Sequence, residues 1–214
     1  MFGTGGSALV AKTLGEGDKE KANRYFSLFV YVCAALGIVF TVIGMFIAPP
    51  VAEALGAEGQ MLHDAVLYSR IILAALPFGV LQLLFQSFMI TAEKPMLGLW
   101  VTVSSGVTNM VMDAVLVTLL PQEWKLTGAA IATALSQTVG GAIPLVYFSR
   151  KNSSTLHLGK THYDSKAVFK ACINGSSEFM SNISMSVVAM LYNLQLMKCA
   201  GENGIAAYGV MMYV

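Results

Sequence analysis

Five long runs of apolar residues divide the sequence, and short polar stretches separate them. The runs lie at Ser27–Ala48, Val66–Ala92, Met96–Leu120, Gly128–Ser149 and Val168–Met197. A helix needs roughly 20 predominantly apolar residues to cross a bilayer. Each run reaches that length, so the pattern predicts five membrane-spanning helices.

The runs are continuous, and this excludes the other architecture that spans membranes. A transmembrane β-barrel has segments of about 10 residues in which apolar and polar positions alternate. The composition also favours helices in lipid, since 56% of the residues are hydrophobic and 12% are charged, whereas soluble domains carry roughly 25% charged residues. We therefore predict an all-α fold, a multi-pass transmembrane helical bundle in the lipid bilayer of the cell membrane.

Shorter apolar stretches lie at both ends of the sequence. Met1–Ala11 is too short to span, and Gly204–Val214 begins a further crossing that stops short. We expect the sequence to be an internal piece of a longer protein.

Lysine and arginine are distributed unevenly between the predicted loops. They concentrate in Lys12–Arg24, Glu93–Pro95 and Arg150–Lys166, whereas Pro49–Ala65 carries acids and no Lys or Arg. Cytoplasmic loops of membrane proteins are enriched in Lys and Arg. The three basic loops are therefore predicted to be cytoplasmic.

The third run contains an acidic residue. Thr102, Ser105, Asn109 and Asp113 follow spacings of three, four and four, so they form one stripe on a helix. A centred Asp costs roughly 2.5 to 3.5 kcal/mol on insertion scales, so such an acid indicates a role with ions, protons or charged cargo. We interpret Thr102 and Ser105 as hydrogen-bonding partners between helices and predict that Asp113 binds a cation with help from Asn109.

Polar side chains also mark the second and fourth runs. Gln82 and Gln86 share a face of the second run, which indicates a wet or hydrogen-bonded surface. In the fourth run Thr133 and Gln137 are candidates to line a site. The adjacent pair Gly140-Gly141 permits close approach of a neighbouring helix.

The fifth run holds a second acid, Glu178, within the polar stretch Asn174–Asn182. We predict that Asn174, Glu178 and Asn182 share one face, and that this face lines protein or water rather than lipid. The alternative is a helix that starts later and leaves Glu178 at the membrane interface, because the apolar run after it is nearly long enough to span alone.

Several blocks of the sequence resemble the multidrug and toxic compound extrusion family of antiporters. The stretch GTGGSALVAKTLGEGDKEKAN, at Gly3–Asn23, is similar to the end of the family's second helix and the loop that follows. Pro77–Pro95 resembles the fourth helix with its basic-Pro turn, Asn109–Asp113 the fifth helix, Gly128–Gln137 the sixth and Asn174–Asn182 the start of the seventh. The resemblance covers nearly the whole sequence, in order.

This resemblance implies twelve helices in two pseudo-symmetric six-helix lobes that work by alternating access. It assigns residues 1–150 to the first lobe, from the end of helix two to helix six. Residues 151–166 would form a cytoplasmic loop between the lobes. Residues 167–214 would begin the second lobe, with helix seven and the start of helix eight.

The resemblance also implies roles for individual residues. In the family's first lobe an Asn and an Asp of the fifth helix and a Thr of the sixth bind the coupling proton or Na⁺. Asn109 and Asp113 match the first two directly, and Thr133 is the best match for the third. Glu178 corresponds to a seventh-helix Glu that some members use for a cation site in the other lobe.

We therefore expect a multidrug efflux antiporter that exports organic, often cationic, drug-like compounds in exchange for H⁺ or Na⁺. Its substrate cavity is expected to include Gln82, Gln86, Gln137, Asn174 and Asn182. We expect no enzymatic activity, no catalytic residue, no cofactor besides the coupling ion, no metal except a transported Na⁺ at Asp113, and no nucleic-acid partner. The full-length protein is expected to be a monomer.

Three alternatives stay open from the sequence. A flippase of the same superfamily that moves lipid-linked oligosaccharides would favour a cationic cavity for pyrophosphate, whereas the spans here hold acids. A membrane-embedded enzyme lacks any HExxH or Ser/His constellation in this sequence. A channel would be expected to show a ring of charged groups, and the lone Asp113 provides no such ring.

Overall fold

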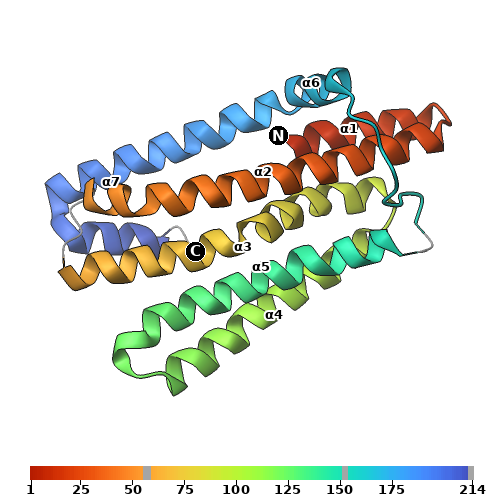
Figure 1. The fold of residues 1–214 in the computed structure, drawn as a ribbon. Coiled ribbons are helices and arrows are strands. Elements are labelled where there is room, and N and C mark those ends of the chain that lie inside the picture. Colours follow the sequence, from red (N-terminus) through yellow and green to blue (C-terminus); the bar gives the residue numbers. More distant parts are fainter. Residues whose placement is uncertain (55–58, 151–153, 212–214) are drawn as a thin grey trace.

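The computed structural model describes residues 1–54, 59–150 and 154–211 as α-helices joined by short turns and one longer segment (Figure 1). The helices are α1 (Phe2–Gly15), α2 (Lys19–Ala54), α3 (Gly59–Thr91), α4 (Pro95–Leu119), α5 (Lys125–Ser149), α6 (Ser165–Asn174) and α7 (Ser176–Met211). A short 3-10 turn, Gln122–Trp124, precedes α5. No strand occurs in the described ranges, and the predicted all-α fold is confirmed.

Four helices in the described part of the chain are long and apolar enough to cross a membrane. They are α2, α3, α4 and α5. These helices match the first four predicted spans to within one residue at the C-terminal ends of α3, α4 and α5, and α2 and α3 begin seven or more residues before their apolar runs.

The predicted fifth span, Val168–Met197, is wrong at its start. Gly175 separates α6 from α7, so Asn174 ends one helix while Glu178 lies on the next. A side chain at residue 175 would place its Cβ 2.1 Å from the carbonyl oxygen of Met1, which shows how closely α1 approaches this junction. The hydropathy of the run does not reveal such a break, because it depends on the residue types and not on the direction of the backbone.

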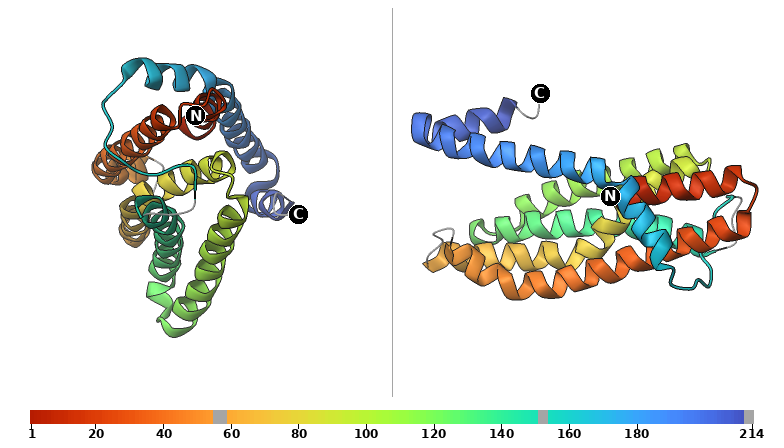
Figure 2. Two further views of the ribbon diagram at one scale, coloured as in Figure 1. Left: turned by 90° about the vertical axis from the view of Figure 1, so that its right-hand side faces the viewer. Right: turned by 90° about the horizontal axis from the view of Figure 1, so that it is seen from above.

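The C-terminal end of the chain agrees with the expected start of a further crossing. The helical assignment of α7 runs from Ser176 to Met211, and the last part of its ribbon turns back on the rest of α7 before the C-terminus (Figures 1 and 2). The last three residues, 212–214, lie outside the described part of the chain.

The three basic loops lie at the same end of the molecule (Figure 1). Between α1 and α2 the chain turns at Gly17, whose φ of +86° suits glycine, and Asp18 accepts a hydrogen bond from the backbone N–H of Lys21 at 3.0 Å. Between α3 and α4 the turn has Glu93 at a φ of +58°, and Pro95 begins α4. This shared end agrees with the predicted common cytoplasmic side.

An aromatic core joins the helices at this basic end. The ring of Phe26 from α2 lies 5.1 Å from the rings of both Phe88 and Phe148, which come from α3 and α5. All three side chains are fully buried. Leu156, from the segment between α5 and α6, is also fully buried in this core.

The segment that carries Leu156 is hydrogen-bonded to α2 along its length. The backbone N–H of His157 donates to Asn23 Oδ1 at 2.7 Å, and that of Gly159 donates to Ser27 Oγ at 3.0 Å. Thr161 Oγ1 donates to the carbonyl oxygen of Arg24 at 2.9 Å. These bonds and the buried leucine fix the described part of the connection across the end of the bundle.

Small residues bring α3 and α5 together, as the pair Gly140-Gly141 predicted. A Cβ at residue 141 would lie 2.4 Å from the carbonyl oxygen of Phe78, and a Cβ at residue 140 would lie 2.4 Å from Cδ of Gln82. Only glycine permits this separation of the two backbones.

Helix α7 diverges from the other helices. It meets them near the N-terminal end of α1 and then runs away from α2 to α5, as both views of Figure 2 show. Most described side chains of α7 up to Tyr192 are exposed, including the apolar Met185, Met190 and Leu191.

Candidate functional site

A cavity of about 820 Å³ lies between α1, α2, α3 and the start of α7. Its polar side chains are Thr4, Gln86, Ser87, Glu178 and Asn182, and its other walls are mainly apolar. No residue of α4 or α5 lines it, and no described residue that lines it is Lys or Arg. Glu178 is therefore the one charged side chain among the described residues that line the cavity, and the other walls are mostly apolar.

Glu178 is held at the wall of this cavity by groups from two helices. Thr4 Oγ1 of α1 donates a hydrogen bond to Glu178 Oε2, and the amino group of Met1 lies 3.9 Å from the same oxygen. Glu178 occupies the first turn of α7, where the exposed backbone N–H groups favour a carboxylate. Asn182 Nδ2 donates to the carbonyl oxygen of Glu178 at 2.9 Å, which fixes the amide one turn further along.

Because Thr4 contacts Glu178, its place along α1 shows how far Glu178 lies from the basic end of the bundle. Thr4 lies eight residues before Lys12 on α1, which corresponds to about 12 Å along the helix axis. Glu178 therefore lies well below the basic end of the molecule. This depth favours the interpretation in which Glu178 faces protein or water over the alternative interfacial position.

The chemistry of the cavity suits an organic cation. Cavities of roughly 300 to 1,000 Å³ accommodate drug-sized ligands, with apolar walls and a few polar groups that orient the ligand. The Glu178 side chain is 47% exposed, so its carboxylate is accessible from the cavity. It can accept a proton, a Na⁺ ion or the charged group of a ligand.

The second acid, Asp113, lies elsewhere, on α4, and its side chain is partly exposed. The antiparallel register of α4 and α5 follows from two contacts. Ser105 Oγ donates to the carbonyl oxygen of Ser136 at 2.8 Å, and a Cβ at residue 128 would lie 3.1 Å from Cβ of Leu116. Asn109 is one turn along α4 from Ser105, so it is level with Thr133, about one turn back along α5.

Asn109 and Thr133 therefore lie at the same level of the α4–α5 pair, with Asp113 one turn further along α4, and their common role stays a prediction. All three side chains are partly exposed. None of them donates or accepts a side-chain hydrogen bond within the described residues, so their polar atoms are available to another group. The described part of the chain contains no cluster of three or more His, Cys, Asp or Glu side chains that could hold a metal ion.

The two other polar residues of the α4 stripe differ in their surroundings. Ser105 is buried and bridges to α5, and Gln82 Nε2 of α3 donates to its Oγ at 3.4 Å. This contact confirms the interpretation of Ser105 as an interhelical hydrogen-bonding group. Thr102 is exposed and donates to the carbonyl oxygen of Gly98 on its own helix at 3.0 Å, so the corresponding interpretation of Thr102 is wrong. At Thr102 the polar stripe of α4 therefore points partly away from α5.

Gln82 and Gln137 lie in the contact between α3 and α5. Gln82 packs over Gly140, and a Cβ at residue 79 would lie 3.1 Å from Gln137 Oε1. Gln137 Oε1 is buried and has no hydrogen-bond partner among the described residues. Neither glutamine lines the Glu178 cavity in this conformation.

The structure thus separates the predicted site residues into groups. Gln86, Glu178 and Asn182 line one cavity, whereas Asn109 and Asp113 lie on α4 and Thr133 lies on α5, outside that cavity. Asn174 is exposed at the end of α6 and does not line the cavity, because the break at Gly175 directs it away from α7.

Thr4 is the site residue that sequence reasoning missed. It lies in Met1–Ala11, which the hydropathy pattern identifies only as part of a span. Its contact with Glu178 joins residues 174 positions apart, and no local pattern indicates such a pairing. The run of small residues around it, GTGGS, was the one available signal of close helix contact.

Curated relatives are multidrug export proteins. The chain is 29% identical to the multidrug export protein MepA of Staphylococcus haemolyticus over 211 residues, which cover 98% of this chain and 46% of that protein. It is 25% identical to MepA of Staphylococcus aureus over 214 residues, with the same coverage. The chain therefore spans just under half the length of these relatives.

Solved structures show the same fold. An inward-facing multidrug resistance MATE family transporter of the MOP superfamily superimposes with a TM-score of 0.84 at 23% identity, covering 97% of this chain and 47% of that one. A MOP superfamily transporter from Pyrococcus furiosus, described as having a binding pocket of reverse polarity that suggests a different function, gives a TM-score of 0.85 at 23% identity, covering 99% and 48%.

A family model assigns the chain directly. The model named MatE matches residues 1–115, which is more than half of the 214 residues. The match includes the end at which α1, α2 and α3 pack together and extends along α4 past Asp113. The transporter relatives and the shared fold agree with it, and the chain belongs to the MatE family of membrane transporters.

Proposed function

We propose that the protein exports organic, often cationic compounds in exchange for H⁺ or Na⁺, and that it does so as a monomer by alternating access. The observation that carries this proposal is the Glu178 carboxylate, which lies in a mostly apolar cavity of drug-sized volume whose described lining residues include no Lys or Arg. The names of the curated relatives, which are multidrug export proteins, support it.

The coupling follows from competition for carboxylates. A carboxylate away from bulk water is costly unless a proton, a metal cation or a cationic ligand neutralises it. The occupants therefore exclude one another. If the inward-facing and outward-facing states differ in affinity for them, the gradient of one occupant drives movement of the other.

Asp113 is proposed as a separate cation site, with Asn109 and Thr133 as neighbouring oxygen donors. The Glu178 cavity contains no residue of α4 or α5, so the two acids do not share a ligand in this conformation. Carboxylate, amide and hydroxyl oxygens are groups that a Na⁺ ion or a proton-bearing water can contact. In this proposal Asp113 takes the coupling ion and Glu178 faces the exported compound.

The proposed domain organisation places the cavity between two lobes. Residues 1–150 would form the first lobe, 151–166 the cytoplasmic connection and 167–214 the start of the second lobe, although residues 151–153 and 212–214 lie outside the described ranges. The divergence of α7 from the other helices supports this division (Figure 2). Transporters with internal repeats commonly hold their substrates where the repeats meet.

The charge of the cavity disfavours a flippase for lipid-linked oligosaccharides. A pyrophosphate group would need cationic side chains, and the described lining provides an acid instead. The sign of the cavity charge therefore distinguishes an exporter of organic cations from a flippase that binds pyrophosphate.

The experiment is transport by the full-length protein in proteoliposomes. A fluorescent organic cation and a neutral dye of similar size would be measured under an imposed pH gradient and, separately, under a Na⁺ gradient. We expect faster movement of the cation under at least one gradient, and no movement of a lipid-linked pyrophosphate sugar. Movement that is independent of both gradients, or restricted to the pyrophosphate lipid, would overturn the proposal.

A further inference from the structure

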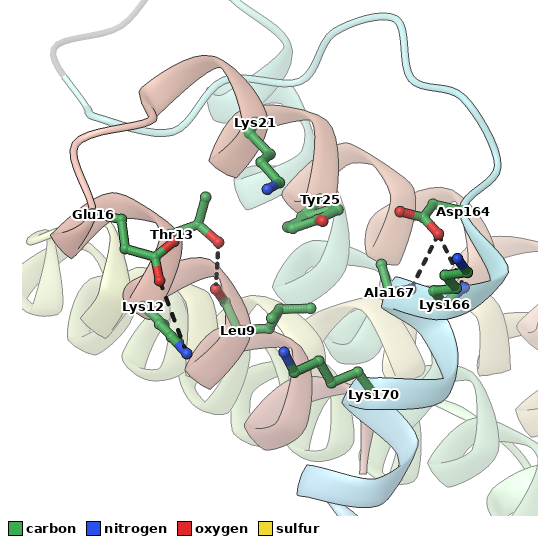
Figure 3. A pocket seen from close by; sticks show the side chains of 10 residues that line it. All are labelled: Leu9, Lys12, Thr13, Glu16, Lys21, Tyr25, Asp164, Lys166, Ala167 and Lys170. Carbon is green, nitrogen blue, oxygen red and sulfur yellow. Dashed lines mark hydrogen bonds and ion pairs between the residues drawn. The ribbon is translucent and has the colours of Figure 1, made fainter.

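A second hollow, of about 270 Å³, lies at the basic end of the molecule between α1, α2 and α6. Figure 3 shows the side chains around it. Four lysines line it, Lys12 from α1, Lys21 from α2, and Lys166 and Lys170 from α6. It is distinct from the Glu178 cavity, with which it shares no lining residue. We call it the lysine pocket.

The lysine pocket carries an excess of positive charge. Its two acids are Glu16 and Asp164, so four ammonium groups face two carboxylates. Glu16 lies 3.9 Å from Lys12 Nζ. Asp164 caps α6 and accepts hydrogen bonds from the backbone N–H groups of Lys166 and Ala167 at 3.0 and 3.3 Å.

The remaining three lysines of the pocket form no ion pair with any residue in the described ranges. Lys21 Nζ lies 5.9 Å from the centre of the Tyr25 ring, which is a contact with an aromatic face. Neither Lys166 nor Lys170 forms an ion pair with a described residue. The pocket thus gathers cationic groups from three helices without neutralising them, which favours an anion as the occupant.

The helix that supplies two of these lysines has an amphipathic pattern. Ala167 and Ala171 are buried against α1, whereas Phe169 and Ile173 are 69% and 57% exposed. Lys166 and Lys170 lie on the helix face between these two pairs. A short helix with exposed apolar side chains beside lysines is typical of the membrane interface, where the apolar groups enter the acyl region and the ammonium groups reach the headgroups.

We propose that the lysine pocket binds the phosphate of an anionic phospholipid headgroup, with Phe169 and Ile173 against its acyl chains. The location agrees, since the basic loops at this end are predicted to be cytoplasmic, and the cytoplasmic leaflet carries anionic lipids that bind basic pockets between helices. A free phosphate ion would use the lysines but not the exposed apolar pair. The bound lipid holds α6 against α1 and α2. This inference does not depend on which compound the protein exports.

The test uses the purified full-length protein and native mass spectrometry in detergent, with equimolar phosphatidylglycerol and phosphatidylcholine as probes. The parent protein should retain phosphatidylglycerol in preference. The double variant Lys166→Gln/Lys170→Gln should bind it about 25-fold more weakly, because each lysine near an anionic surface contributes about fivefold. The control Lys19→Gln/Lys160→Gln removes two exposed lysines at the same end but outside the pocket, and it should retain the parental preference.

A second variant should strengthen lipid binding instead of weakening it. Glu16→Gln removes the acid beside Lys12, so it should strengthen retention of phosphatidylglycerol even if the double lysine variant fails to fold. Equal retention of both lipids by the parent, equal losses in the pocket and control variants, or unchanged retention in Glu16→Gln would overturn the proposal. Displacement of the lipid by millimolar inorganic phosphate, with binding of the phosphate alone in its place, would also overturn it, because the site would then recognise a free anion.

Discussion

Glu178 and Asp113 are both acids within the helical bundle, but their surroundings give them different chemistry. Glu178 begins a helix, receives a hydrogen bond from Thr4 and faces an apolar cavity. Asp113 lies late in α4, at the level of an early part of α5, and its side chain is partly exposed. The first arrangement suits a large ligand that brings its own apolar surface. The second suits a small ion.

Glu178→Gln in the full-length protein should reduce export of an organic cation about tenfold or more, because interactions with charged groups contribute about 1.5–3 kcal/mol. Export of a neutral compound should change much less, since the amide keeps the shape and part of the hydrogen bonding. Initial rates of dye efflux from cells with matched expression measure both. The control Ser181→Ala lies one turn along α7, outside the cavity, with its hydroxyl bonded to the carbonyl oxygen of Ser177. An equal loss for both dyes would argue against an electrostatic role.

Asp113→Asn should abolish export driven by either a pH or a Na⁺ gradient while leaving the protein inserted. Asn costs less than Asp to place in a membrane helix, so a purely structural residue would tolerate the exchange. Asn109→Ala should give a milder defect, mainly a weaker apparent affinity for the ion. Transport in proteoliposomes under each gradient measures both effects.

Thr102→Ala serves as the control for the Asp113 experiment. Thr102 lies on the same helix, is exposed and bonds only to its own backbone, so transport should be unchanged. Parental rates for Asp113→Asn under both gradients would remove Asp113 from the coupling mechanism.

The helices themselves were largely predictable from the sequence, and the reason is physical. A membrane-spanning helix must be apolar over a fixed length, so α2 to α5 are visible as continuous runs. A close helix contact at Gly140-Gly141 was also predictable, whereas the identity of the partner helix, α3, came from the structure. The break at Gly175 was not, because it results from contact with the backbone of α1, which is remote in sequence.

The candidate sites were predictable to the same extent, because proximity within one helix follows from the sequence and contacts between remote helices do not. Asn109 and Asp113 are four residues apart on one helix, so their proximity follows from helical periodicity alone. The cavity around Glu178 depends on how four helices meet, and Thr4 enters it only through that packing.

Gly141→Ala should destabilise the contact between α3 and α5. Its Cβ would lie 2.4 Å from the carbonyl oxygen of Phe78, which belongs to a helical backbone and cannot move aside alone. Such overpacking typically costs about 1–3 kcal/mol, so the thermal unfolding midpoint of the purified full-length protein should fall.

Gly106→Ala on α4 is the matched control, because a Cβ there would meet nothing within 4 Å. It should leave the midpoint unchanged or raise it slightly, since alanine favours a helix over glycine by about 0.5–1 kcal/mol. Equal midpoints for the two variants would contradict the packing seen between α3 and α5.

The arrangement of the whole chain predicts its orientation in the membrane. The basic loops lie at one end (Figure 1), whereas α3 begins at the opposite end near Gln60. Single cysteines at Gln60 and Lys160, introduced into a variant without other cysteines, should therefore react with a membrane-impermeant maleimide from opposite sides. Lys160 should react only after the cells are opened. Reaction of both positions in intact cells would contradict the predicted topology.

The 214-residue chain, expressed alone, should insert into the membrane but transport nothing. An alternating-access carrier must close around its ligand from two sides, and in this chain the Glu178 cavity is bounded by α1, α2 and α3 on one side and only the start of α7 on the other. The exposed apolar side chains along α7 indicate surface that further helices would cover, and the relatives are about twice as long. Gradient-driven efflux of an organic cation would be compared between the isolated chain, the full-length protein and an empty vector at matched expression. Efflux by the isolated chain above the vector background would show that one lobe suffices, and it would remove the two-lobe arrangement from the proposed mechanism.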